Sequence, residues 1–236
     1  MIQLDEVFFS YREGEPILEG ITVEIPRGLT LVVGPNGAGK STFLKIIAGV
    51  EKPERGRACI DGYDLWREEI AARRCIAYVP EQPDLTPYAT LMDILKLVCR
   101  LRSEAPSAAR EALERAGLGA LGNRSVRELS LGQRRRAVLA AAWIGRPRVL
   151  ILDEPLEALD RAMKEMMLSW VDKSLAEEVA VVLATHDIEP FASRADRALG
   201  FHRRRYLLLD TLPQDPAQRL RRLEALSRGS AAGAEG

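Results

Sequence analysis

The chain has 236 residues, of which 34 are basic and 34 acidic, so its formal net charge at pH 7 is zero. Hydrophobic residues make up 47% and charged residues 29%, which is close to ordinary globular usage and argues against a disordered or fibrous chain. The charge balance also argues against bulk binding to nucleic acid, which a strongly basic domain would indicate.

The cysteines and the apolar runs of the chain exclude several kinds of site and segment. Three cysteines lie far apart and only two histidines occur, so neither a disulfide framework nor a zinc site is supported, and a reducing compartment fits. Residues 1–13 carry acids before any apolar stretch, unlike a secretory signal. The longest apolar runs, such as AVLAAAWIG, are about half the length that spans a bilayer. We therefore expect no transmembrane segment, and a membrane role would need another protein as an anchor.

The first fifty residues have the element order of a parallel α/β fold. Residues 2–11, 17–26 and 28–34 are predicted strands, and the last of them is a short apolar run that a glycine ends. From Lys40 the apolar residues follow helical spacing, and Gly49 is a helix stop signal. Strand, glycine-rich loop and helix in this order are typical of a parallel α/β sheet.

The middle of the chain predicts a hairpin, a helical lobe and further strands. Residues 56–65 have the pattern of a short hairpin, and residues 76–80 that of a buried strand. Over residues 83–146 the sequence pattern is typical of helices, which predicts an inserted helical subdomain. Apolar runs at 149–154 and 179–187, with a helical segment between them, suit strands that are covered on both faces.

Together these segments predict an α/β fold with a mainly parallel sheet, an N-terminal antiparallel β-subdomain and the inserted helical subdomain. We expect one domain over residues 1–225. Beyond Phe201 the sequence becomes basic, and residues 226–236 are rich in Ala, Gly and Ser. Such a composition at a terminus predicts a disordered tail.

Residues 34–42, GPNGAGKST, match the Gly-x-x-x-x-Gly-Lys-Ser/Thr pattern of a phosphate-binding loop (P-loop), and they follow a strand and precede a helix. Glycines let successive backbone N–H groups point at phosphate oxygens, and the helix N-terminus adds partial positive charge. Lys40 is expected to reach the terminal phosphates, and the Ser41 hydroxyl to ligand Mg²⁺. The alternative, a flexible loop without a ligand, would not need these flanking elements. The predicted nucleotide-binding residues here are Gly34, Pro35, Asn36, Gly37, Ala38, Gly39, Lys40, Ser41 and Thr42.

Two acids, Asp153 and Glu154, end the apolar strand in VLILDEP. A carboxylate at the carboxyl end of a strand in a doubly wound sheet faces the ligand crevice. We therefore expect Asp153 to hold Mg²⁺, directly or through water, and Glu154 to polarise the water that attacks the γ-phosphate. The alternative is that both acids cap a helix starting near Pro155. The nearby P-loop motif favours the first interpretation.

The stretch RELSLGQRRRA contains a helix start followed by three arginines. Ser130 and Gln133 form a Ser-x-x-Gln capping box, and Gly132 leaves the first turn open to close approach. Within it, LSLGQ resembles the signature sequence of ATP-binding cassette (ABC) ATPases, usually Leu-Ser-Gly-Gly-Gln. Residues 129–133 are called the signature segment from here on.

Other motifs agree with this resemblance in their order along the chain. Tyr11 precedes the P-loop where the family places an aromatic residue that stacks on adenine. Gln82 in YVPEQ follows a strand, like the family's Q-loop glutamine, which senses the γ-phosphate and borders the transmembrane contact. The EALD segment ending at Asp160 looks like the D-loop, and His186 in ATHD looks like the switch histidine.

The resemblance implies that ATP and Mg²⁺ are the cofactors and that two cassettes, identical or related, dimerise head to tail. The signature helix of one cassette would present its N-terminus to the nucleotide on the P-loop of the other. The residues so implied are Ser130, Gly132 and Gln133 for the nucleotide in trans, Tyr11 for adenine, Glu154, His186 and Gln82 for catalysis, and Ser41, Gln82 and Asp153 for the metal.

Some positions depart from the family pattern or lie beside it. Leu131 replaces the usual first glycine of the signature, and Glu157 stands where the D-loop commonly has a serine, which puts the cross-dimer contact there in question. The three arginines at 134–136 are expected to form mainly a solvated helix face, with one of them near the nucleotide.

The implied function is the ATP-hydrolysing subunit that powers an ABC membrane transporter, with a transmembrane permease subunit as its partner. It would lie in the cytoplasm at the membrane face, without direct nucleic-acid contact, and residues 82–95 would grip a helix of the permease. The segment PEQPDLTPYATLMDIL favours exporter-type cassettes. Two alternatives stay open: a soluble ABC ATPase acting on ribosomes or DNA, which usually has tandem cassettes or a long coiled coil, and a small-molecule kinase, which would not explain the signature segment.

Overall fold

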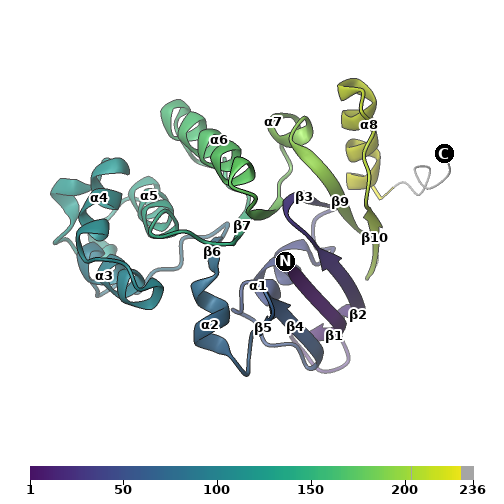
Figure 1. Ribbon diagram of the computed structural model, residues 1–236, viewed down its shortest axis with the longest axis horizontal. Coiled ribbons are helices and arrows are strands. Elements are labelled where there is room, and N and C mark those ends of the chain that lie inside the picture. Colours follow the sequence, from purple (N-terminus) through teal and green to yellow (C-terminus); the bar gives the residue numbers. More distant parts are fainter. Residues whose placement is uncertain (203, 230–236) are drawn as a thin grey trace.

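The computed structural model describes residues 1–202 and 204–229, and its strands form two sheets (Figure 1). The smaller sheet is antiparallel, in the order β2-β1-β4-β5. Along β1 and β2 buried side chains alternate with exposed ones, with interruptions, as expected for a sheet with one face on the core. The strands are β1 (Ile2–Ser10), β2 (Pro16–Ile25), β4 (Arg55–Ile60) and β5 (Tyr63–Asp64).

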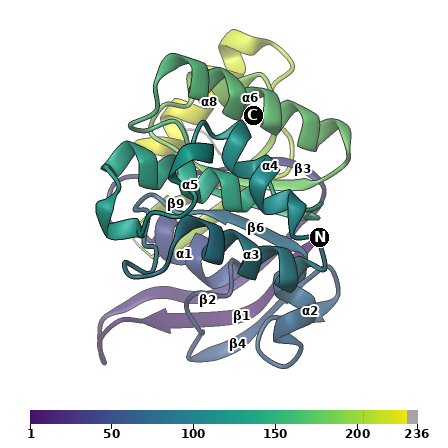
Figure 2. The ribbon, with the colours of Figure 1, turned by 90° about the vertical axis from the view of Figure 1, so that its left-hand side faces the viewer.

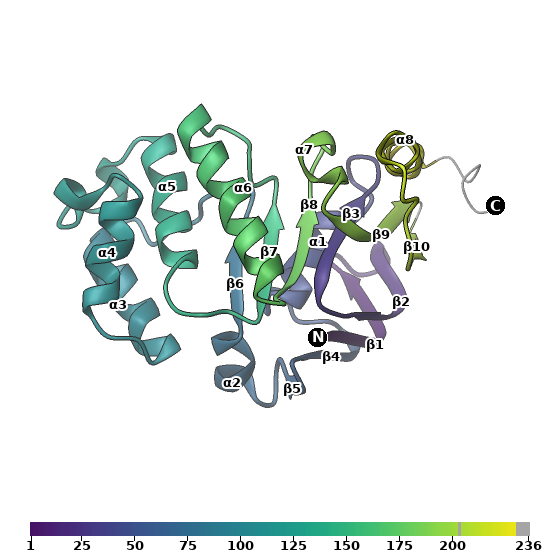
Figure 3. The same cartoon turned by 45° about the horizontal axis from the view of Figure 1, so that its top comes forward.

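The larger sheet of the described residues has the order β10-β9-β3-β8-β7-β6, which Figure 3 shows from right to left. All neighbours pair in parallel except β10, which is antiparallel to β9. Every residue of β7 and β8 is buried, so these apolar runs are covered on both faces as predicted. The strands are β3 (Gly28–Val33), β6 (Ile76–Val79), β7 (Val149–Asp153), β8 (Ala180–Ala184), β9 (Ala195–His202) and β10 (Arg205–Leu209).

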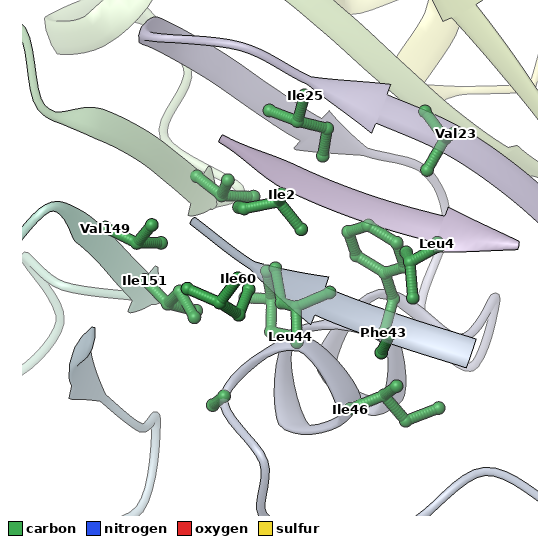
Figure 4. Close-up of a cluster of buried hydrophobic side chains, with 14 of the residues drawn as sticks. Ile2, Leu4, Val23, Ile25, Phe43, Leu44, Ile46, Ile60, Val149 and Ile151 are labelled. Atoms are coloured by element: carbon green, nitrogen blue, oxygen red, sulfur yellow. The ribbon is translucent and has the colours of Figure 1, made fainter. Parts of the chain in front are cut away.

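Helix α1 (Lys40–Ile47) joins the two sheets through a shared apolar core (Figure 4). Phe43 and Leu44 of α1 belong to one buried cluster with Ile2 and Ile60 of the small sheet and Ile151 of β7. The helix is therefore held from both sides. This support fixes the start of α1 at the end of β3, where the P-loop motif lies.

The opposite face of the large sheet is covered by helices from the C-terminal half of the chain. Met167 and Trp170 of α6 (Arg161–Ala176), Phe191 of α7 (Glu189–Ala192) and Leu223 of α8 (Pro216–Ser227) share one buried cluster with the strands. Part of α5 joins them through Leu139. The large sheet thus lies between two apolar layers.

A cluster of three helices projects at one side of the molecule, where it faces the viewer in Figure 2. It consists of α3 (Leu91–Arg102), α4 (Ser107–Arg115) and α5 (Leu131–Ala142), and 3-10 turns at Gly119–Leu121 and Val126–Glu128 lie between α4 and α5. Leu95, Leu113 and Ala140 are among the members of a separate apolar core. These helices lie within 83–146, the range where the sequence predicts a helical subdomain.

Several elements are present that the sequence did not predict. They are α2 (Glu69–Arg74), α7, β9, β10 and α8. The hydroxyl of Tyr206 in β10 donates to the carbonyl of Thr22 at 2.6 Å and accepts from its N–H at 3.0 Å, which links the two sheets. Because Leu226 and Ser227 belong to α8, the predicted tail begins too early, and the rest of it from 230 to 236 lies outside the described residues.

The cysteines and the helix lengths bear on two sequence-based exclusions. Cys59, Cys75 and Cys99 are all free. Within residues 1–202 and 204–229, none of the helices combines the length and the apolar character that a bilayer crossing requires.

Candidate functional site

The carboxyl ends of four parallel strands meet at one edge of the large sheet. In the register of the sheet, Asp153 of β7 pairs with Ala184 of β8, and Ala184 also pairs with Val32 of β3. On the other side of β7, Leu152 pairs with Val79 of β6. The segments that follow these strands therefore converge. A cavity of about 680 Å³ opens there, lined by Ile17, Asn36, Gly37, Gly39, Lys40, Ser41, Thr42, Glu81, Asp153, Glu154, Leu156, Glu157, Lys164, Thr185, His186 and Asp187.

The P-loop motif forms a tight turn between β3 and α1. Gly34 has φ 147°, and a Cβ atom there would lie 2.3 Å from the carbonyl oxygen of Phe201 in the neighbouring strand β9. Gly39 has φ 102° and is the residue before the first turn of α1. Side chains at either position would be strained or would clash. The turn brings the N-terminus of α1 to the cavity, where its free N–H groups favour an anion.

Lys40 lies at the start of α1 and is only 8% exposed. Its Nζ donates to the carbonyls of Gly34 at 2.8 Å and Pro35 at 3.1 Å, so the side chain curls around the loop. Burial lowers the pKa of Lys40, and the nearby acids, Glu154 foremost, act in the opposite direction. An anion in the cavity would likewise favour the charged ammonium.

Asp153, at the end of β7, is 2% exposed. Burial raises its pKa to about 6, while the neighbouring Ser41 hydroxyl lowers it and the acids Glu81 and Glu154 raise it further. A cation beside the carboxylate would offset the cost of its buried charge. Asp153 is thus a carboxylate whose surroundings favour a positive ligand.

The oxygen atoms of Ser41 and Asp153 fit Mg²⁺, which prefers hard oxygen ligands. In the described part of the chain no three histidine, cysteine or acidic side chains form a group that could hold a metal by themselves. Mg²⁺ is usually held by one or two carboxylates together with the phosphates of its substrate. A hydroxyl and a carboxylate beside a phosphate-binding loop are therefore the kind of groups that could hold this ion.

Glu154 follows β7 and is held through both its backbone and its side chain. Its N–H donates to the carbonyl of Ala184 at 2.9 Å, and its φ is 46°, a left-handed conformation. Its Oε2 accepts from the Thr185 hydroxyl at 3.1 Å and from the N–H of His186 at 3.2 Å. The alternative that Asp153 and Glu154 cap a helix at Pro155 is wrong, because the next helix starts at Arg161.

His186 follows β8 and lines the same cavity. Its Nε2 lies 3.5 Å from Oε1 of Glu154, and its side chain is largely exposed. The histidine therefore lies beside Glu154 in the same cavity.

Gln82 and its neighbour Glu81 lie differently with respect to the cavity, and the role of Gln82 stays a prediction. Gln82 is exposed and is not among the residues that line the cavity, whereas its neighbour Glu81 lines it. Glu81 also acts electrostatically on Lys40 and Asp153. Glu81 lies two residues after the last residue of β6, the same offset that His186 has after β8. Counting from the strand end would have added Glu81 to the predicted cavity residues.

The signature segment lies apart from the cavity of its own chain. Ser130 accepts from the N–H of Gln133 at 3.3 Å, and Gln133 Oε1 accepts from the N–H of Ser130 at 2.9 Å, so the predicted capping box is confirmed. Ser130 and Gly132 are exposed, and a Cβ at Gly132 would meet nothing within 4 Å. The side chain of Leu131 is 58% exposed. The start of α5 is thus open to an approaching molecule.

The D-loop-like segment connects the cavity to α6. Glu157 lines the cavity and is exposed. Asp160 caps α6 by accepting from the N–H of Met163 at 2.9 Å, and it also pairs with Arg136 of α5 at 2.5 Å. These contacts attach the segment to the helix that carries the signature.

Tyr11 lines a second cavity of about 800 Å³ that adjoins the P-loop at Pro35 and Ala38. Tyr11 is 51% exposed, and its ring is perpendicular to that of Phe9, with the ring centroids 4.8 Å apart. The contact with Phe9 supports the ring while half of the residue stays exposed, which suits the predicted contact with a nucleotide base.

The structure differs from the expectation for the three arginines. Arg135 is only 6% exposed and donates to the backbone carbonyls of Glu81 and Glu154. It belongs to the interior of the molecule and not to a solvated helix face. Its partners are backbone atoms of distant segments, so no residue pattern near 135 could have revealed them.

Comparison with known proteins identifies the family. The family model for ABC transporters matches residues 18–157. This chain belongs to that family. A putative ABC transporter ATP-binding protein of Pyrococcus horikoshii is 32% identical to the cassette over 84% of the cassette and 79% of the relative. The sulfate/thiosulfate import ATP-binding protein of a Synechocystis strain is 37% identical over 76% of the cassette, which spans 52% of that relative.

The fold of this chain is also similar to that of a solved ATP-binding cassette. A dimeric ATP-binding cassette in a post-hydrolysis state, bound to ADP and inorganic phosphate, matches with a TM-score of 0.74 and 28% identity. The match covers 88% of the cassette and 98% of that chain. The α/β fold predicted from the sequence is confirmed, and the cassette is an ATP-binding ATPase of the ABC family.

Proposed function

We propose that the cassette is the ATP-hydrolysing subunit of a membrane transporter and that two cassettes dimerise around ATP. The observation that carries this proposal is the exposed, capped start of α5, which lies outside the cavity of its own chain. Such a helix end attracts anions. A phosphate held by the P-loop of one cassette can thus meet the signature segment of another, and the neighbour with ADP and inorganic phosphate is itself dimeric.

The P-loop residues and Tyr11 would bind the nucleotide. Backbone N–H groups of residues 36–41 would receive the phosphates, and Lys40 would turn from the loop carbonyls toward the terminal phosphates. Tyr11 would stack on the base in the second cavity. Ser130, Gly132 and Gln133 of the second cassette would close the site over the γ-phosphate.

Ser41 and Asp153 would hold Mg²⁺, and the buried position of Asp153 supports this role. When bound, the ion would neutralise charge that develops on the phosphate oxygens. Glu81 also lines the cavity beside this position, and Gln82, the residue that follows it, would contact the metal and the γ-phosphate side. Asp153 and Ser41 orient the ion from the protein side.

Glu154 would take the proton from the attacking water. Thr185 and the N–H of His186 occupy Oε2 and hold the carboxylate in one orientation. Oε1 faces His186 at 3.5 Å and can accept from a water molecule between the acid and the γ-phosphate. His186 would contact the γ-phosphate on the other side of that water.

A permease subunit would bind beside the Q-loop region. Tyr88, Leu97 and Leu101 are exposed apolar side chains on α3 and the segment before it, and Ile70 of α2 is exposed as well. Exposed apolar groups gathered on neighbouring elements mark interaction surfaces. These residues extend the predicted contact range of 82–95 and would receive a cytoplasmic helix of a membrane protein.

The direction of transport follows from the permease and not from the nucleotide site. The segment at 80–95 favours an exporter, whereas the Synechocystis relative is named as an import protein. We keep the exporter as the prediction, with import as the outcome that would replace it. Identification of the membrane protein that co-purifies with the cassette decides between them. Co-purification with ribosomes or DNA would instead favour the soluble alternative, which the transporter names of the relatives do not support.

Replacement of Glu154 by Gln tests the function. We expect ATP hydrolysis to fall by about a hundredfold or more, because proton transfer by a positioned side chain contributes on that order. The variant should still bind ATP and should form dimers that persist in Mg·ATP on size-exclusion chromatography. Normal turnover would reject Glu154 as the base, and a monomer in Mg·ATP would reject the dimer.

The control for this test is Glu165→Gln on α6. Glu165 is exposed and pairs with Arg161 one turn away, at 2.9 Å. Such surface pairs contribute little to stability. This variant should keep wild-type turnover and the wild-type dimer equilibrium, so it separates a general charge effect from the role of Glu154.

A further inference from the structure

Arg135 carries a buried positive charge whose hydrogen-bond partners are backbone carbonyls. The side chain is 6% exposed, and none of the ion pairs found among residues 1–202 and 204–229 includes it. Its guanidinium instead donates to two backbone carbonyls, those of Glu81 and Glu154. Because a charge is costly to bury, an arginine in this place needs a reason beyond filling space.

The bond to Glu154 acts on the backbone of the proposed base. The Glu154 N–H continues the β7–β8 pairing by donating to Ala184 at 2.9 Å, and its φ of 46° is disfavoured for a residue with a side chain. Arg135 holds the other end of the same residue through its carbonyl. The left-handed turn, which aims the carboxylate at Thr185 and His186, is thus fixed on both sides.

The bond to Glu81 acts in the same way on the segment after β6. The carboxylate of Glu81 lines the nucleotide cavity while its carbonyl accepts from Arg135. One guanidinium therefore fixes the backbone of two cavity acids that are more than seventy residues apart in the sequence. A planar group with several fixed donors suits this double contact better than a lysine.

Arg135 also belongs to the first turns of α5, whose N-cap is Ser130. The element that would meet the nucleotide of a second cassette is hence connected, through one side chain, to the two acids of its own site. We propose that Arg135 is a positioning residue for Glu154 and Glu81, which makes hydrolysis in each cassette depend on the placement of its own signature helix. This inference rests on the proposed role of Glu154 as the base.

The neighbouring arginines provide matched controls. Arg134 donates through Nε to the carbonyl of Leu129, five residues earlier in the chain, at 3.1 Å. Arg136 pairs with Asp160 at the start of α6. Arg134 is less buried than Arg135 and reaches neither Glu81 nor Glu154. Arg134→Met removes the same charge from the same helix without touching the two acids.

The test compares Arg135→Met, Arg135→Gln and Arg135→Lys with Arg134→Met by steady-state ATP hydrolysis. We expect kcat to fall about tenfold or more in Arg135→Met and Arg135→Gln, with KM for ATP within about threefold of wild type, because the loss is in the reacting geometry. Arg135→Lys should recover part of kcat, since its ammonium can reach one carbonyl. Arg134→Met should keep both parameters.

A double variant separates positioning from general damage. In the Glu154→Gln background, Arg135→Met should cause a smaller fold-loss of turnover than in the wild type, since the part that acts through the base is already absent. Additive losses would overturn the inference, and so would a rise in KM at unchanged kcat. If Arg135→Met does not fold, the folded Gln and Lys variants decide by the same kcat criterion. Normal turnover of Glu154→Gln alone would reject the proposed base, whatever Arg135 does.

Discussion

The buried carboxyl group of Asp153 lowers the stability of the folded protein at neutral pH, but the same group is the proposed ligand of Mg²⁺. Burial raises its pKa to about 6 from an ordinary value of 3.8. Between these two values the folded protein holds a proton that the unfolded chain has released, so the protonated form stabilises the fold. That contribution is lost as the pH rises through 6, where the wild-type protein must carry a buried charge.

We expect Asp153→Asn to stabilise the nucleotide-free protein at pH 7, by roughly 1–3 kcal/mol, since each pKa unit corresponds to about 1.4 kcal/mol. The difference between variant and wild type should shrink as the pH falls toward 4, where the wild-type acid is already neutral. Urea unfolding between pH 4 and pH 7.5 measures it. The same variant should lose Mg²⁺-dependent hydrolysis.

Asp172→Asn is the control with the opposite sign. The hydrogen bond from Arg194 lowers the pKa of Asp172, so its contribution to stability is present at neutral pH and is lost as the pH falls. This variant should therefore be less stable than wild type at pH 7. If both variants shifted stability in the same direction, the explanation by buried charge would be wrong.

Residue by residue, the sequence predicted those positions whose chemistry is contained in a short motif. Lys40 and Asp153 occupy the cavity because a P-loop and a strand end place them there whatever the rest of the chain does. That Glu81 lines the cavity depended on where β6 ends, which a five-residue pattern does not define. Arg135 depended on carbonyls from two other segments and could not be predicted.

At the scale of elements, α5 starts with one of two similar serine caps in the helical cluster. Ser130 and Gln133 exchange bonds at the start of α5, and five residues earlier the Ser125 N–H and hydroxyl donate to Glu128 at 2.8 and 2.7 Å. Both serines are structural, but only Ser130 lies where a second cassette's nucleotide would arrive. A comparison of variants at Ser125 and Ser130 can therefore separate helix capping from contact with the nucleotide.

We expect Ser130→Ala and Ser125→Ala to lose similar stability, about 1 kcal/mol each, as is usual for a lost cap. Ser130→Ala should in addition lower kcat/KM by about tenfold or more, the cost of one hydrogen bond to a charged group. Urea unfolding and ATP hydrolysis measure the two effects. Equal hydrolysis in both variants would show that the serine at 130 only caps its helix.

The elements that the sequence missed have polar residues inside their patterns. In β9, Asp196 accepts from the N–H of Leu29 at 2.8 Å and Arg197 donates to the carbonyl of Arg27, so two charged residues support the start of β3 and interrupt the apolar run. The apolar runs of β7 and β8, by contrast, have no such interruption. The strands β7 and β8 were predictable from their unbroken apolar runs, whereas β9 was missed because charged residues interrupt its run.

At the scale of the whole molecule, Arg102 joins the helical cluster to the large sheet. Its Nη1 donates to carbonyls at the end of α5, including that of Ala142 at 3.1 Å, and its Nη2 donates to Ile76 of β6 at 2.9 Å. Burial lowers its pKa to about 10, so it stays charged at neutral pH. Arg102 and Arg135 thus attach α5 near both of its ends, one to the start of β6 and the other to the segment after it.

We expect Arg102→Met to loosen the helical cluster while the sheet around the P-loop stays intact. The methionine keeps much of the apolar stem but leaves several buried carbonyls without a donor, at a cost of about 1–3 kcal/mol. Because the cluster has its own apolar core, this cost should appear as faster hydrogen exchange in α3, α4 and α5. Amides of β3 and α1 should keep their protection.

Arg100→Met, a substitution of an exposed residue on the same helix, is the control and should leave exchange in all three helices unchanged. A uniform rise in exchange across both parts would instead show that cluster and sheet open as one cooperative unit.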